Sequence, residues 1–330
     1  MKTPPSATDH EGQPRTIGVE VELSGLTLEE IAAAVIATYG GRVEPESRSR
    51  YQCEVVGHRF DQFGAFKIEL DASLLKDGRL DDTFRKIGLE AGELTDSIED
   101  LVERSAMHVV PMEVVTPPLP LERLPELEEL REALLKRAVK DTRSAWFFAF
   151  GLHLNPSVPS VEATELRDVL RAFLLLYEWL VERLEVDTAR KLTPYIDPFP
   201  RRYSKLVLTP GYEPDLTGLI DDYLEHNPTR NRPLDMLPLF TWLDRDRVLS
   251  VVDDGLTSSR PTFHYRLPNC NIADPAWSIT REWDHWVVVE RLAADKALLE
   301  RMTGEWHKRH EHPLAHRLER IKAAIAQWFE

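Results

Sequence analysis

Residues 16–23 read TIGVEVEL, a segment that alternates apolar residues with small or acidic ones. Successive side chains of a β-strand point to opposite faces, so Val19 and Val21 share one face while Glu20 and Glu22 share the other. Two carboxylates at neighbouring positions of one face repel each other unless a cation neutralises them. The segment therefore predicts a half-buried strand, and its acidic face predicts a bound cation.

The same period-two pattern recurs in later segments, each with one apolar and one polar face. The polar positions are Lys67, Glu69, Asp71 and Ser73 in FKIELDAS, Glu113 in PMEVVTPP, His153 and Asn155 in FGLHLNP, and His264 and Arg266 in TFHYRLPN. For any one strand, the solvent face of an antiparallel sheet is the simpler interpretation. Taken together, the strands carry short carboxylates and imidazoles with few Thr or Lys. Such a set suits Mg²⁺ or Mn²⁺ better than Zn²⁺, and Lys67 and Arg266 are candidate phosphate ligands.

Amphipathic segments with helical periodicity separate and follow these strands. Thr27 and Glu30 form a capping-box pattern at the start of one helix. Longer helices are predicted over 122–140 and 162–185, and the end of the chain is also helical in pattern. The mixture predicts an α+β fold with a mostly antiparallel sheet of about six strands and helices on one face.

No composition shift divides the chain, so we expect one domain over residues 15–330 with a helical C-terminal part. Residues 1–14 are polar and contain prolines, which predicts a flexible tail.

The chain has 41 Lys and Arg against 56 Asp and Glu, a formal net charge of -15. This balance argues against nucleic acid or an anionic membrane surface as the main partner, because both require a basic face. The two cysteines are too few for a disulfide framework and are expected to be reduced and buried. No window reaches the ~18 apolar residues of a membrane span, and the start lacks the apolar region of a signal peptide. These features predict a cytoplasmic protein.

Five motifs occur in a fixed order: GVEVEL, DASL, MEVVTPPL, GLHLNP and TFHYRLPN. Together they resemble the putative amidoligase family, relatives of glutamate–cysteine ligase and glutamine synthetase within the carboxylate–amine ligase superfamily. The resemblance covers most of the chain, from about residue 16 to about residue 283. It implies a sheet curved into a half-barrel, with ATP and Mg²⁺ on its concave face and helices on its convex face. It also implies that ATP phosphorylates a substrate carboxylate and that an amine then displaces phosphate to form an amide.

The resemblance also implies roles for individual residues. It implies metal ligands at Glu20, Glu22, Glu113 and His153, catalytic roles for Glu22, Asp71 and Arg266, and an ATP-binding role for Ser73 beside the candidate phosphate ligands Lys67 and Arg266. This chain departs from the family pattern at Asn155, where the family often has histidine, and at His264, where it often has glutamate. We assign both departures to substrate binding, and they leave the number of metal ions open.

Other cationic and imidazole residues have alternative interpretations. Arg232, close to a helix start expected at about Pro233, is a candidate ligand for a substrate carboxylate, or equally a solvated loop residue. Lys205, with Arg201 and Arg202 in PFPRRYSKLVL, is a candidate nucleotide ligand. A histidine-rich segment carries His307, His310, His312 and His316. Pro313 interrupts its helical spacing, so a solvated helix end is the simpler interpretation than a second metal site.

The leading hypothesis is an ATP- and Mg²⁺-dependent carboxylate–amine ligase that acts on an amino acid or peptide through an acyl phosphate. Two alternatives stay open: a metal-dependent hydrolase or phosphotransferase that uses the same acidic face, and a non-catalytic family member that binds nucleotide or peptide. The sequence contains no phosphate-binding P-loop, no dinucleotide-binding glycine motif and no serine-hydrolase motif. It identifies neither the acid, the amine nor the oligomeric state.

Overall fold

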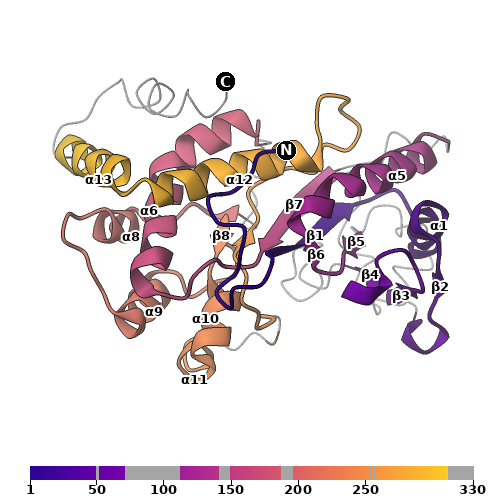
Figure 1. Cartoon of the computed structure of the whole chain (residues 1–330), viewed down its shortest axis with the longest axis horizontal. Helices are drawn as coiled ribbons and strands as arrows, with labels where there is room; N and C mark the ends of the chain where they lie inside the picture. The colour runs from indigo at the N-terminus through magenta and orange to yellow at the C-terminus, as the bar shows by residue number, and fades with distance from the viewer. Residues whose placement is uncertain are drawn as a thin grey trace, which may run out of the picture.

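The structure is a computed structural model of the whole chain (Figure 1). It describes residues 1–49, 52–70, 112–140, 149–186, 196–252, 255 and 257–310. Asp71 and Ser73, for which sequence analysis predicted roles, lie outside the described residues, as do His312 and His316.

The strands of the described residues form one nine-stranded sheet with the order β2-β3-β4-β5-β1-β7-β9-β8, and β6 pairs with β1. Their bounds are β1 Thr16–Leu23, β2 Arg42–Val43, β3 Gln52–Val56, β4 Phe66–Leu70, β5 Met112–Val115, β6 Leu119–Pro120, β7 Ala149–Pro156, β8 Leu234–Asp235 and β9 His264–Tyr265. Each pairing between them is antiparallel. The strand β1 is therefore central, with β5 and β6 on one side and β7 on the other.

One face of the sheet is apolar and carries the helices. On β1, the alternating residues Ile17, Val19, Val21 and Leu23 are all buried, as the sequence pattern predicts. Tyr265 of β9 continues this face, and its ring lies 5.1 Å from the ring of Trp286 on α12. Burying this apolar stripe against helices supplies the main stabilising term of such a layered fold.

The helices that cover this face are α1, α5, α6 and α12 (Figure 1). The bounds of the described helices are α1 Leu28–Tyr39, α5 Glu128–Lys140, α6 Ala163–Arg183, α8 Arg201–Val207, α9 Leu216–His226, α10 Leu237–Leu243, α11 Arg245–Leu249, α12 Ile279–Ala294 and α13 Lys296–His310. Short 3₁₀ turns occupy Pro45–Ser47, Asp61–Phe63 and Leu121–Leu127.

Most predicted elements are confirmed, with boundaries that local chemistry explains. The capping box at α1 is present, because Glu30 donates its backbone N–H to the Thr27 hydroxyl and its carboxylate accepts the Thr27 N–H. The helix predicted from residue 122 begins as the 3₁₀ turn Leu121–Leu127, in which Pro125 has no N–H to donate. The helix start expected at Pro233 is wrong: residues there form β8, and α10 begins at Leu237.

The fold class is an α+β protein with one open, curled antiparallel sheet, as predicted, although the described residues form nine strands rather than about six because short strands such as β2, β6 and β8 show no alternation. The closer likeness to the half-barrel of glutamine synthetase stays a prediction. Cys53 and Cys270 are both buried and form no disulfide. No helix in the described part of the chain is long and apolar enough to cross a membrane.

The N-terminal residues lie along α12 at the edge of the helical layer (Figure 1). The indole Nε1 of Trp283 donates to the carbonyl of Lys2 at 3.0 Å. At the start of β1, the Arg15 guanidinium donates two 2.7 Å hydrogen bonds to the Glu290 carboxylate, and both side chains are buried. The flexibility expected of residues 1–14 stays a prediction, but the segment follows a docked path against α12.

We predict that Arg15→Ala lowers the free energy of unfolding by about 3–5 kcal/mol, because it leaves a buried carboxylate without its cation. Among the described residues, Glu290 would then retain the 2.7 Å hydrogen bond from Trp286 Nε1. The measurement is chemical denaturation. Arg42→Ala is the control, because Arg42 pairs with Glu44 at 3.5 Å on the exposed surface, where such pairs contribute about 0–1 kcal/mol. Equal losses in the two variants would contradict the importance of the buried pair.

Candidate metal and anion site

The polar residues of three neighbouring strands form a row of carboxylates across the sheet. In the register of β1 with β5, Glu22 lies opposite Glu113. In the register of β4 with β5, Glu69 lies opposite the same Glu113. Like charges directly opposite each other on one sheet face destabilise a sheet. This row, Glu69–Glu113–Glu22, is an acidic face of the kind that the sequence pattern predicts, and a bound cation would relieve its repulsion.

A second group forms where β1 meets β7. Glu20 lies opposite His153, and its Oε2 is 2.7 Å from His153 Nδ1. The register between these strands shifts between Val21 and Leu23. The other ring nitrogen of His153, Nε2, lies 3.2 Å from Oε1 of Glu22. A neutral imidazole has only one N–H, so it can donate to only one of these two carboxylates. A cation bound to the ring nitrogen that carries no hydrogen would take the place of a second proton.

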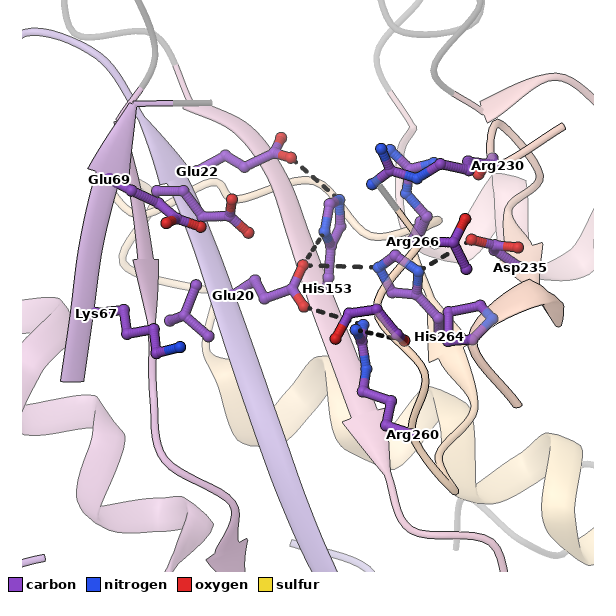
Figure 2. Close-up of a pocket in the computed structure, with 15 residues that line it drawn as sticks. Glu20, Glu22, Lys67, Glu69, His153, Arg230, Asp235, Arg260, His264 and Arg266 are labelled. Atoms are coloured by element: carbon purple, nitrogen blue, oxygen red, sulfur yellow. Dashed lines mark hydrogen bonds and ion pairs between the residues drawn. The ribbon is translucent and has the colours of Figure 1, made fainter. Parts of the chain in front are cut away.

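The strands β8 and β9 add a carboxylate–histidine pair. Asp235 lies opposite His264, and its Oδ2 is 3.2 Å from His264 Nδ1. The other oxygen of Asp235 accepts the backbone N–H of Leu237 at 2.9 Å. The second ring nitrogen of His264, Nε2, faces Glu20 Oε2 at 3.6 Å. Figure 2 shows the Glu20 carboxylate between the two imidazoles.

Arg230, Arg260 and Arg266, which lie in loops beside β8 and β9, also line this region (Figure 2). Arg260 donates to Asn155 Oδ1 at 2.8 Å and lies 3.4 Å from Glu20 Oε1. Asn155 in turn donates its amide N–H to the same Glu20 oxygen at 2.9 Å. Arg266 donates to the backbone carbonyl of Arg230. These arginines are thus held on loop segments, and the carboxylates on strands.

The charge states of the central residues follow from their surroundings. Burial opposes the charged form of Glu20, but its hydrogen bond with His153 is the largest opposing cause, and the pKa of this carboxyl group is held well below its usual value. Burial lowers the pKa of His264, although Asp235 and Glu20 partly oppose this shift. At neutral pH an ionised Glu20 therefore faces a neutral His264 imidazole.

These residues line one cleft of about 250 Å³. Its acidic lining comes from Glu20, Glu22, Glu69, Glu113 and Asp235, and its cationic lining from Lys67, Arg230, Arg260 and Arg266. A cleft that brings oxygen ligands for a divalent cation next to guanidinium groups can hold a metal ion together with an anion such as phosphate or carboxylate.

The residues present fit a divalent metal ion. Glu20, His153 and His264 each offer one ligand atom, and these atoms all lie within 4.8 Å of one another. His264 Nε2 is buried and has no hydrogen-bond partner among the described residues. Carboxylate oxygens and imidazole nitrogens are common metal ligands, and a buried nitrogen without a partner is costly unless something binds it.

A family model described as putative amidoligase enzyme matches residues 13–288, which is most of the chain. The chain belongs to this family. The resemblance inferred from the five motifs is thereby confirmed, and the family indicates an enzyme that forms amide bonds. Searches of curated proteins and of solved structures returned no match.

The structure brings most of the residues predicted from the amidoligase motifs into this cleft. Its lining includes Glu20, Glu22, Lys67, Glu113, His153, His264 and Arg266. Asn155 lies beside the cleft through its bonds to Glu20 and Arg260. Lys205 is exposed on α8 and is not part of the lining. Arg232 is buried outside the lining, where it donates to Asn227 and to the carbonyls of Asp197 and Pro198.

The sequence pattern predicts no role for Asp235, Arg230 or Arg260, and it places Glu69 on the polar strand face without a function. Asp235 lies in a strand of two residues, too short to show alternation. Arg260 precedes β9 in TSSRP, which shows no periodicity that could place it. Only Glu69 could have been placed in the site from the sequence, because strand alternation puts it on the same face as Lys67.

We predict that Glu22→Gln leaves the fold intact and, without metal, raises the free energy of unfolding by up to about 1 kcal/mol. It removes one charge from a pair of like charges directly opposite each other on the sheet. The same variant should lose most of the thermal stabilisation that Mg²⁺ gives to the parent chain. Thermal unfolding with and without Mg²⁺ measures both effects. A large loss of stability in the metal-free variant would instead show that Glu22 is needed to build the sheet.

Proposed function

We propose that this amidoligase-family chain is an ATP- and Mg²⁺-dependent carboxylate–amine ligase acting on an amino acid or peptide. The observation that carries the proposal is the cleft, whose lining joins a carboxylate row on β4, β5 and β1 to arginines from three loop segments. A ligase of this kind must hold a divalent cation, phosphate groups and a substrate carboxylate within one small volume. Family membership supports the amide-forming part of the proposal.

The chain offers ligands for each group. Glu22 and Glu113 are the proposed ligands of Mg²⁺, and Glu20 and His153 beside them are proposed to bind a divalent cation in the same cleft. When bound, Mg²⁺ would offset the charge of the ATP phosphates. ATP would supply the phosphoryl group that activates the substrate carboxylate, so that an attacking amine displaces phosphate and leaves an amide. The role proposed for Asp71 in this chemistry rests on the family motif alone.

Within that reaction, the arginines orient anions. Arg266 is the proposed phosphate ligand, because its bond to the Arg230 carbonyl directs the guanidinium beside the cleft. A guanidinium offers a planar fork of donors that matches phosphate oxygens, and it stays charged at any physiological pH. Lys67, on the strand β4, lines the same cleft and is a second candidate. Lys205 lies outside the lining, which gives it no support as a nucleotide ligand.

The substrate carboxylate is proposed to lie near Arg260, with Asn155 next to it. His264, a substrate candidate from its sequence position, contacts Glu20 and Asp235 instead. Arg260 already binds the Asn155 amide oxygen and a carboxylate oxygen of Glu20, so its guanidinium has the geometry to bind a carboxylate. Arg232, for which we considered the same role, is bonded to backbone carbonyls instead and receives no support from its position.

A metal-dependent hydrolase is the second candidate, favoured by one observation. Two histidines and one carboxylate, as in Glu20, His153 and His264, are also the ligand set of some hydrolytic zinc sites. Such an enzyme would cleave its substrate in the absence of ATP.

The test is a screen of amino acids and peptides for ADP release with Mg²⁺-ATP, with mass spectrometry of the products. The proposal expects ADP release that requires both a carboxylic acid and an amine, and equal amounts of ADP, phosphate and amide. Product cleavage without ATP would support the hydrolase. Tight Mg²⁺-ATP binding without turnover of any acid and amine pair would support a non-catalytic binding protein.

We predict that Arg266→Lys lowers ligase turnover by about a hundredfold or more at saturating Mg²⁺, the range seen when one transition-state donor is removed. Lysine keeps the charge but offers a point charge rather than a bidentate fork. The measurement is the steady-state rate of ADP release. Arg245→Lys, at an exposed position of α11, is the matched control and should keep the parent rate. Turnover of Arg266→Lys within a few-fold of the parent would remove Arg266 from the phosphate site.

A further inference from the structure

The two oxygens of Glu20 have different partners. Oε1 accepts from the Asn155 amide and lies close to the Arg260 guanidinium. Oε2 faces only imidazole nitrogens in the contacts that the structure gives, His153 Nδ1 at 2.7 Å and His264 Nε2 at 3.6 Å. The amide and the guanidinium thus hold one oxygen of the carboxylate and direct the other toward the two histidines.

Asp235 determines which ring nitrogen of His264 faces Glu20 Oε2. It is almost fully buried, and its Oδ1 is held by the backbone N–H of Leu237. Its Oδ2 therefore meets His264 Nδ1 at 3.2 Å as an acceptor, which requires the hydrogen to be on Nδ1. The opposite tautomer would bring a ring lone pair against a carboxylate. A carboxylate that orients a histidine through its second nitrogen is a common support for a metal ligand.

The consequence lies at Nε2 of His264, which is 3.6 Å from Glu20 Oε2, too far for a hydrogen bond. This nitrogen is buried without a hydrogen-bond partner among the described residues. With the hydrogen on Nδ1, its lone pair faces a carboxylate oxygen, so two acceptors point at each other. A cation between them removes that repulsion and binds both.

We propose that Glu20, His153 and His264 bind one divalent transition-metal ion, such as Mn²⁺, Fe²⁺, Co²⁺ or Zn²⁺, and that Asp235 is the residue that positions His264 for it. The site is chemically distinct from the carboxylate row Glu69–Glu113–Glu22, whose oxygen-only ligands suit Mg²⁺. Two imidazole nitrogens favour transition metals over Mg²⁺. The inference deepens the proposed function, because it names the metal class at one part of the same cleft.

The test uses the full chain, stripped of metal with a chelator and without ATP or substrates. Co²⁺ is the probe, because its visible absorption reports nitrogen ligands, and Mn²⁺ binding is followed by the loss of the free-ion EPR signal. We expect one Co²⁺ ion bound with a nitrogen-ligand spectrum that an approximately hundredfold excess of Mg²⁺ does not displace. Displacement by Mg²⁺, or a spectrum of oxygen ligands alone, would overturn the proposal.

Two variants test the individual roles. His264→Gln removes a nitrogen ligand and should lower Co²⁺ affinity at least about tenfold and shift the absorption band. Asp235→Asn keeps the acceptor for Leu237 N–H and turns its amide N–H toward His264 Nδ1, which forces the hydrogen onto Nε2. It should therefore lower the affinity about 10–100-fold although His264 is still present. Unchanged affinity in either variant would remove that residue from the site.

The matched control is His285→Gln. His285 is also buried, and its Nδ1 lies 3.2 Å from a carboxylate, Glu282, but both residues are on α12 and do not line the cleft. It should bind Co²⁺ like the parent, whereas an equal loss would mean that the effects at His264 are general. Should His264→Gln fail to fold, His264→Glu replaces the nitrogen with oxygen and should shift preference from Co²⁺ toward Mg²⁺; an unchanged preference would count against the proposal. Because no ATP is present, this metal site and the ligase activity can fail independently.

Discussion

The carboxylate of Glu20 is the contact on which the site depends. It projects from β1, the strand that pairs with both β5 and β7, so its position is fixed from two sides. One of its oxygens is held by Asn155 and Arg260 and the other faces two histidines. A charge in this position costs free energy unless each lone pair has a partner. The neighbouring strands and loops give each oxygen of Glu20 a hydrogen-bond donor, Asn155 for Oε1 and His153 for Oε2, so sheet register and site geometry are set by the same pairings.

Burial of the apolar face of β1 offsets the repulsion between the carboxylates on its acidic face. Four alternating residues of β1 are buried beneath the helices, and α12 also holds the N-terminal segment through the Arg15–Glu290 pair. The repulsion between Glu22 and Glu113 is of the order of about 1 kcal/mol or less, whereas burying one large apolar side chain contributes about 1.5–3 kcal/mol. The helical layer therefore tolerates a carboxylate row that an isolated sheet would not, and this leaves the open face available for cation binding.

Sequence periodicity predicted the strand faces well, because alternation is a local property. The faces of Glu20, Glu22, Glu113 and His153 all agree with it. Register between distant strands is not local, so the row formed by Glu113 with its two neighbours followed only from the structure. Short strands and loops carry no periodicity, which is why Asp235 and Arg260 were missed. An arginine in a loop can equally serve backbone carbonyls, as Arg232 does, and its sequence does not distinguish the two uses.

The two departures from the family motifs are related in space. Leu154 pairs with Tyr265 and Ser157 with Thr262, and the same register brings Asn155 beside His264. In the amidoligase pattern, histidine is frequent at the first of these positions and glutamate at the second. Here the imidazole is on the other strand, so the chain keeps two histidines around Glu20 while one carboxylate is lost. Asn155 donates its amide N–H to Glu20 and so orients this carboxylate. With Asn155 and His264 in place of histidine and glutamate, the surroundings of Glu20 contain fewer carboxylate oxygens. The two departures lie beside each other and can be understood together.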